Sequence, residues 1–155
     1  QRNALREVFR LLRDGGALYL AIENKDSHRY RQGYPDDHTG IRHISYLSRE
    51  RADQRSREIR GRGYRTYTYN RGEYEELLKS AGFSTIKCFY PYPDYKTFSS
   101  LAPLDSTEIR SYMLSHLDSV EHSKEEMLTL VAERKNFAVE SGIDGASSFL
   151  IKATK

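Results

Sequence analysis

The feature that most constrains the fold is a helix pattern that stops at two glycines and leads at once into a short apolar run. Apolar residues in segment 3–13 recur at the spacing of one helix face, and Asn3 is placed to cap that helix. Gly15 and Gly16 end it. Residues 17–23 then fit a strand buried on both faces, of the kind found inside α/β sheets. This succession forms half of a βαβ crossover, so we predict an α/β fold.

The later segments supply further helices and strands. Asn70 and Glu73 form a capping-box pattern, which predicts a helix over 71–81 that ends at Gly82. A polar helix is expected over 48–60. The remaining expected elements are strands near 83–90 and 147–153 and helices near 106–117 and 124–141.

A long polar segment separates the first strand from the capped helix. Residues 25–72 contain 12 Lys and Arg residues against 6 Asp and Glu residues, whereas the whole chain has a formal net charge of only +3. A stretch this polar and this long is not expected to form core. The sequence leaves open whether it is a lid, an insertion or a partner surface.

Several classes of protein are excluded by composition. Cys88 is the only cysteine, which rules out an internal disulfide framework and multi-cysteine metal sites, and its place in a strand predicts an inert core thiol. No apolar run is long enough for a transmembrane helix. The histidines His28, His38 and His43 and their neighbouring aspartates match no ligand spacing, so no metal site is expected.

Three segments resemble class I S-adenosylmethionine-dependent methyltransferases. Residues 5–20 are similar to the helix, glycine pair and fifth strand of that family, although Arg13-Asp14 replaces its commoner Lys-Pro. Residues 74–83 resemble the helix before the sixth strand, and 148–153 resemble the seventh strand. Three rarer strings resemble a bacterial subgroup that often occurs beside, or fused to, glycosyltransferases: Ala-Ile-Glu-Asn at 21–24, Asp-Asp-His-Thr-Gly at 36–40 and Tyr-Pro-Tyr-Pro-Asp-Tyr-Lys at 90–96.

The resemblance implies a partial Rossmann-like fold. Residues 1–155 would be the C-terminal part of one methyltransferase domain, with a polar insert at 25–70. The three strands would form a mixed sheet, with the last strand antiparallel between the other two. The family's glycine-rich cofactor loop is missing, because Gly61-Arg62-Gly63 follows no buried strand. Cofactor-binding residues are therefore expected outside this chain, which alone should be inactive.

The implied reaction is methyl transfer from S-adenosylmethionine to a small-molecule or glycan-linked acceptor. A glycosyltransferase is the neighbouring partner that the resemblance suggests, and the expected location is the cytoplasm.

Glu23 and Asn24 follow the first strand directly, at the end where ligands gather in open α/β sheets. A carboxylate and an amide there could orient an acceptor hydroxyl or amine. The alternative is that both residues hold a turn into the insert.

Asp37 and His38 lie in the insert, within a string that the resemblance covers. Histidine beside a carboxylate suits a general base, because its charge changes closest to neutral pH. The alternative is a solvated turn. With the resemblance added, the predicted catalytic residues are His38, Asp37 and Glu23, and the predicted substrate-binding residues are Asn24, Tyr92, Asp94 and Tyr95. For the tyrosines, packing against the insert is the competing explanation.

The main rival function is a non-enzymatic module. Arginines and tyrosines interleave over residues 49–69, which is typical of surfaces for single-stranded nucleic acid or a phosphorylated glycan. Glu50, Asp53 and Glu58 lower the local charge, and the isoelectric point of about 8.9 is below that of most basic domains. A solvated helix with internal ion pairs fits better, so nucleic acid is not the expected partner. A third hypothesis is a catalytically inactive scaffold domain.

Overall fold

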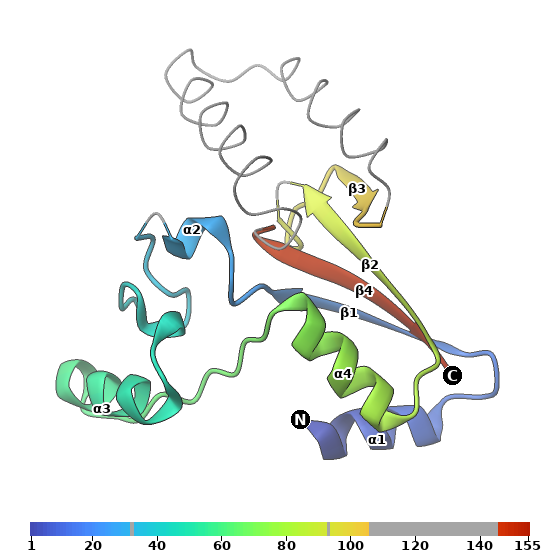
Figure 1. Ribbon diagram of the computed structural model, residues 1–155, viewed down its shortest axis with the longest axis horizontal. Helices are drawn as coiled ribbons and strands as arrows, with labels where there is room; N and C mark the ends of the chain where they lie inside the picture. Colours follow the sequence, from blue (N-terminus) through green and yellow to red (C-terminus); the bar gives the residue numbers. More distant parts are fainter. Residues whose placement is uncertain (32, 93, 106–145) are drawn as a thin grey trace, which may run out of the picture.

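The computed structural model describes residues 1–31, 33–92, 94–105 and 146–155, and their fold is α/β (Figure 1). The predicted helices near 106–117 and 124–141 lie outside these residues. The elements, in chain order, are α1 (Arg2–Leu11), β1 (Ala17–Glu23), α2 (His28–Arg31), the 3-10 helix η1 (Ile44–Tyr46), α3 (Arg49–Arg60), α4 (Arg71–Ala81), β2 (Thr85–Tyr92), β3 (Ser100–Pro103) and β4 (Ser148–Thr154).

The four strands form one sheet in the order β1-β4-β2-β3. The last strand lies antiparallel between β1 and β2, as expected, with Ile22 opposite Phe149 and Cys88 opposite Ile151. Two details of the prediction are wrong. The short strand β3 adds a fourth member beyond β2, and every pair of hydrogen-bonded strands in the described sheet is antiparallel, so it is not mixed. Four residues that end in a proline carry too little pattern to identify a strand.

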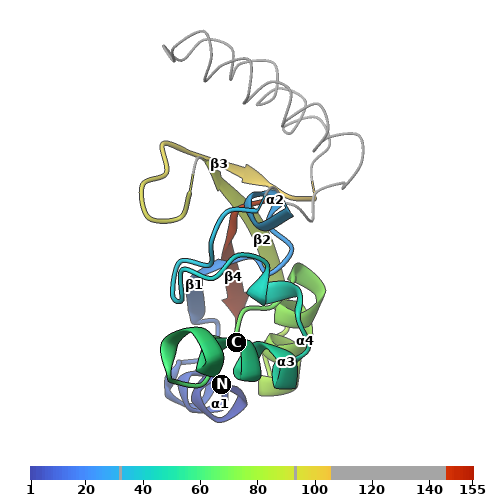
Figure 2. The same cartoon turned by 90° about the vertical axis from the view of Figure 1, so that its left-hand side faces the viewer.

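Helices α1 and α4 lie side by side and cover one face of the sheet (Figure 1). Figure 2 shows both helices at one end of the molecule and β3 toward the other. Leu78 of α4 packs against Phe149 and Ile151 of β4, and all three are fully buried. Burial of side chains of this size contributes about 1.5–3 kcal/mol each to stability.

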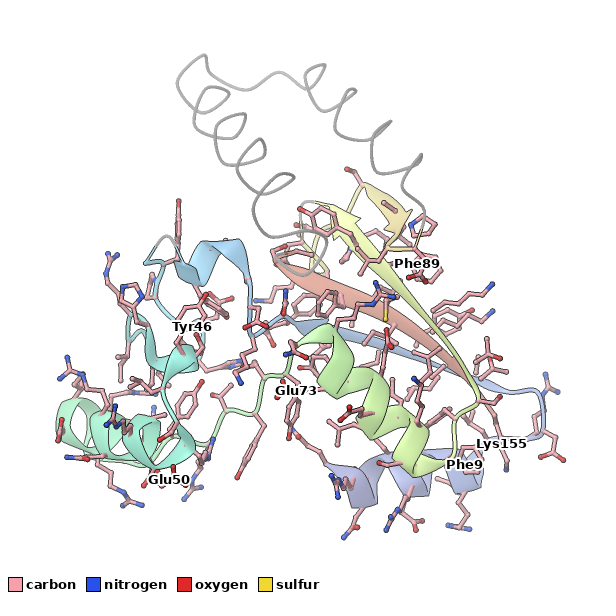
Figure 3. All side chains as sticks on the ribbon, in the orientation of Figure 1. Phe9, Tyr46, Glu50, Glu73, Phe89 and Lys155 are labelled. Atoms are coloured by element: carbon pink, nitrogen blue, oxygen red, sulfur yellow. The ribbon has the colours of Figure 1, made fainter. Side chains whose placement is uncertain are left out.

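Helix α4 ends where α1 comes closest to it. Gly82 has φ +113°, and a Cβ there would come within 2.9 Å of the Phe9 ring, so both conformation and space require glycine. The Phe9 ring meets Phe83 edge-on at 5.2 Å, and Figure 3 shows Phe9 beside Lys155. Phe83 therefore belongs to the packed turn, and β2 begins two residues later than predicted, at Thr85.

Two local predictions at the start of the chain are wrong. Asn3 does not cap α1, because the helix begins at Arg2 and its N-cap is Gln1. Strand β1 has the predicted bounds, but none of its residues is fully buried, and Tyr19 is 62% exposed. The reason is its place: in the described residues β1 is an edge strand, and α1 and α4 cover only one of its faces.

The polar segment after β1 forms a small lobe of its own, built from α2, η1 and α3 (Figure 1). Helix α3 confirms the predicted polar helix, with Ser48 as its N-cap. The lobe has a minor core of Ile41, Ile44, Ala52 and Tyr64, so the expectation that this segment forms no core is wrong. Within the described ranges, none of the helices is long and apolar enough to cross a membrane.

Candidate functional site

A cluster of polar side chains lies at the carboxyl end of β1. The Tyr95 hydroxyl donates a hydrogen bond of 2.9 Å to Glu23 Oε1, and His38 Nε2 lies 3.6 Å from the same oxygen. The Glu23 side chain is only 13% exposed, whereas that of His38 is 49% exposed. The fold therefore brings together three predicted site residues from distant parts of the chain, and it leaves the imidazole open to a ligand.

Glu23 is held by the sheet and by α4. Its backbone pairs with Ser148 of β4, and its carbonyl oxygen accepts a hydrogen bond of 3.2 Å from the Tyr74 hydroxyl. The segment after β2 is tied to the same point, because the Tyr95 N–H donates to Ser148 Oγ at 3.1 Å. Glu23 and Tyr95 are thus both anchored to Ser148 of β4.

Asp36 holds the loop that carries His38, and the sequence prediction missed it. Its carboxylate is buried, and Oδ1 accepts hydrogen bonds from the His38 N–H at 3.1 Å and from the Thr39 N–H and hydroxyl at 2.7 Å each. The Tyr64 hydroxyl donates to Oδ2 at 3.4 Å. An aspartate that begins a turn and is followed by Thr and Gly is the signal that could have identified this role.

Asp37 and Asp94 lie at the rim of the cluster. Asp37 Oδ2 is 3.5 Å from the Lys96 ammonium, and Asp94 Oδ1 accepts a hydrogen bond of 2.9 Å from the Lys96 N–H. Within the described residues, neither carboxylate forms a hydrogen bond or ion pair with Glu23 or His38. Arg60 of α3 donates to the His38 carbonyl at 3.2 Å and fastens this loop to the lobe.

The electrostatics keep the tyrosine of the cluster in its neutral form. Burial first, and then the bond to the Glu23 carboxylate, raise the pKa of Tyr95 to about 12. Burial first, and then Asp36, raise the pKa of Tyr64 to about 12. Near neutral pH both hydroxyls therefore donate to their carboxylates, and each carboxylate remains an acceptor.

One predicted substrate-binding residue, Asn24, lies outside the cluster. Asn24 is fully buried, and its amide donates to the Ala146 carbonyl at 2.8 Å and accepts from the Asp26 N–H at 3.0 Å. This geometry supports the turn-holding alternative and not contact with an acceptor. The Tyr92 backbone ends β2 opposite Ser100, and its side chain is outside the described part of the structure.

The Gly61-Arg62-Gly63 segment does not form a glycine-rich cofactor loop. Gly61 is the C-cap of α3, with φ +69°. The Asp53 carboxylate lies so close to Gly63 that a Cβ there would collide with it, so the space beside this glycine is already filled by a side chain. The strands β1 and β2 are followed by Asn24 and by a proline-rich segment, not by a glycine-rich turn. No group of three or more His, Cys, Asp or Glu side chains that could hold a metal ion occurs in the described ranges.

The arginines of α3 and of the segment that follows it divide into two sets. Arg49 donates to the carbonyls of Thr66 and Tyr64 and so ties α3 to the segment that follows it, whereas Arg57 forms an exposed ion pair of 2.8 Å with Asp53 within α3. Four further arginines are exposed: Arg51, Arg55, Arg62 and Arg65. The internal ion pair agrees with the predicted solvated helix.

Comparisons with protein-family models, curated proteins and solved structures found no match to this chain. Inferences about function therefore depend on the geometry of the Glu23 cluster and on the sequence resemblance.

Proposed function

We propose that this chain supplies the acceptor-activating part of an S-adenosylmethionine-dependent methyltransferase, with a small-molecule or glycan-linked acceptor. The observation that carries the proposal is the single carboxylate oxygen of Glu23 shared by the Tyr95 hydroxyl and the His38 imidazole. The β1-β4-β2 strand order agrees with the partial Rossmann-like fold that the resemblance implies. As the resemblance implies, the donor would bind to residues outside this chain, and the one Gly-x-Gly segment among the described residues forms no cofactor loop.

In this proposal His38 is the general base. Its Nε2 faces Glu23, so Nδ1 is the nitrogen left to take a proton from an acceptor O–H or N–H group. The Glu23 carboxylate then stabilises the positive imidazolium, and the neutral Tyr95 hydroxyl keeps the carboxylate oriented. Asp36 is a positioning residue, because it bonds the His38 backbone and not the imidazole.

The test uses the encoded polypeptide that contains these residues together with a donor-binding half. Transfer of labelled methyl groups is measured to hydroxyl- and amine-bearing acceptors, including cell-envelope sugars. Because general bases contribute about 10²–10⁴-fold to rate, His38→Asn and Glu23→Gln should each lower kcat by about 100-fold or more. His43→Asn is the matched control, since His43 is exposed and its φ of +62° suits asparagine.

Two outcomes would overturn the proposal: no transfer to any acceptor, or transfer that His38→Asn and Glu23→Gln leave unchanged. On the isolated 155-residue chain, calorimetry with S-adenosylmethionine should show no micromolar binding. Micromolar binding would contradict the assignment of donor binding to other residues.

A further inference from the structure

A second hollow lies apart from the Glu23 cluster. It is an open groove of about 790 Å³ lined by the start of α1, the linker that precedes α4, and α4 itself, and this volume is typical of small-ligand sites. Its lining includes Arg2 and Asn3 of α1, Tyr67 and Tyr69 of the linker, and Glu73 and Glu76 of α4. Glu23, His38 and Tyr95 do not line it.

Two aromatic rings that line the groove are each packed against another side chain. The Arg49 guanidinium lies 4.1 Å from the centre of the Tyr67 ring, which is nevertheless 53% exposed. The Tyr69 ring meets Tyr74 edge-on at 5.3 Å, and its backbone bridges to Asn24. Rings fixed in this way lose little freedom on binding a ligand, and their negative faces attract the C–H face of a sugar ring.

Three polar side chains of the lining are free to bind a ligand. Within the described residues, Arg2, Asn3 and Glu76 make no hydrogen bond or ion pair. They offer guanidinium and amide donors together with amide and carboxylate acceptors, which is the mixture that hydroxyl groups need. Glu73 is different, because its carboxylate accepts from the Asn70 N–H at 2.8 Å and lies 3.9 Å from the Lys25 ammonium.

The charge of the free groups selects among ligand classes. Arg2, Glu73 and Glu76 are the charged side chains among the described residues that line the groove, and the Lys25 ammonium lies 3.9 Å from Glu73. These four charges balance, so the groove has no excess of either sign for a phosphate or an ammonium group. Among the described residues that line it, Leu77 is the one aliphatic residue, which disfavours an apolar ligand. A neutral ligand with many hydroxyl groups and an apolar face satisfies both conditions.

We propose that this groove binds a neutral saccharide of one or two rings, stacked on Tyr67 and Tyr69 and hydrogen-bonded by Arg2, Asn3 and Glu76. The inference is independent of the proposed methyl transfer, because the two sites share no residue.

The experiment is a titration of the isotope-labelled chain, followed by backbone amide NMR shifts, with maltose, cellobiose and lactose up to about 50 mM. We expect millimolar Kd values and shifts concentrated at the groove residues. Tyr67→Ala and Glu76→Gln should each weaken binding by about 5-fold or more, equivalent to about 1 kcal/mol. Tyr19→Ala and Glu50→Gln are matched controls at exposed sites, and Figure 3 shows Glu50 on α3, away from Glu73 at the start of α4.

The proposal is overturned if no sugar shifts the groove amides at the highest concentration, or if the two groove variants bind as tightly as the wild type. Tighter binding of glucose 6-phosphate or of glucosamine than of the neutral sugars would also overturn it, because it would show a charged ligand class.

Discussion

Replacement of Asn24 by alanine separates two roles that the sequence left open for this residue. The side chain is fully buried and holds the Ala146 carbonyl at 2.8 Å and the Asp26 N–H at 3.0 Å. Each buried polar group left without a partner costs about 1–3 kcal/mol, and the Asp26 N–H is only partly buried, so it costs less. We expect Asn24→Ala to lower the free energy of unfolding by about 2–4 kcal/mol.

The assay is urea unfolding followed by far-ultraviolet circular dichroism, since the chain has no tryptophan. The expected loss corresponds to a fall in Tm of about 4–16 °C for a domain of this size. Asn3→Ala is the matched control: Asn3 is exposed on α1, and its replacement should change stability by less than about 0.5 kcal/mol. If Asn24→Ala were as stable as this control, the turn-holding role would be refuted. Contact with an acceptor would then be the better explanation for Asn24.

Three other perturbations test the fold. Burial raises the pKa of the Cys88 thiol to about 11, so iodoacetamide at pH 8 should label the chain only as fast as it unfolds; rapid labelling by mass spectrometry would contradict this. The pKa values of Tyr64 and Tyr95 are raised to about 12, so stability that is present below pH 10 should fall between pH 10 and 12 as the unfolded chain releases its protons first. Tyr95→Phe should make that fall shallower in pH-dependent unfolding, and an unchanged slope would refute the assignment. Gly82→Ala should cost about 1–3 kcal/mol, because alanine is strained at φ +113° and its methyl group meets the Phe9 ring, and an unchanged Tm would contradict both reasons.

The elements that the sequence predicted well are those with local causes. The capping box of α4 needs only four consecutive residues, and both of its hydrogen bonds are present, from the Glu73 N–H to Asn70 Oδ1 at 2.9 Å and from the Asn70 N–H to Glu73 Oε2 at 2.8 Å. The bounds of β1 were also predictable. Its burial was not, because exposure of Tyr19 depends on what covers the second face of the sheet, and no local pattern contains that information.

In the candidate site, too, local features could be predicted from the sequence and tertiary contacts could not. Glu23 could be placed at a strand end from its position alone, but its contact with His38 joins a strand to a loop of the insert. No spacing rule connects these two residues, and only the resemblance suggested that they act together. Asp36 and Asp37 are adjacent and chemically identical, and the structure distinguishes them: Asp36 faces inward and Asp37 faces Lys96. Such a choice depends on the register of one turn, which composition cannot give.

The core of the polar lobe explains how an exposed histidine can have a defined position. Ordering a loop residue costs about 1–2 kcal/mol of backbone entropy, and a solvated loop has little to offset it. Here Asp36 bonds both the His38 backbone and the Tyr64 hydroxyl, and Tyr64 belongs to the core of the lobe. The imidazole is therefore carried by the lobe, and its distance from Glu23 depends on how the lobe is joined to the sheet.

The connection between the polar lobe and the sheet runs through Asn24 and Lys25. The Asn24 backbone bridges to Tyr69, the Asn24 N–H donates to the Ser147 carbonyl at 3.3 Å, and the Lys25 N–H donates to the Tyr69 carbonyl at 3.1 Å. The Asn24 side chain holds the Ala146 carbonyl and the Asp26 N–H beside these contacts, so Asn24→Ala should lower kcat in the proposed reaction even at temperatures where the chain is fully folded. Asn70→Ala, which removes a helix cap at a cost of about 1 kcal/mol, provides the comparison. An equal loss of kcat in the two variants would mean that the effect comes from lower stability and not from the position of His38.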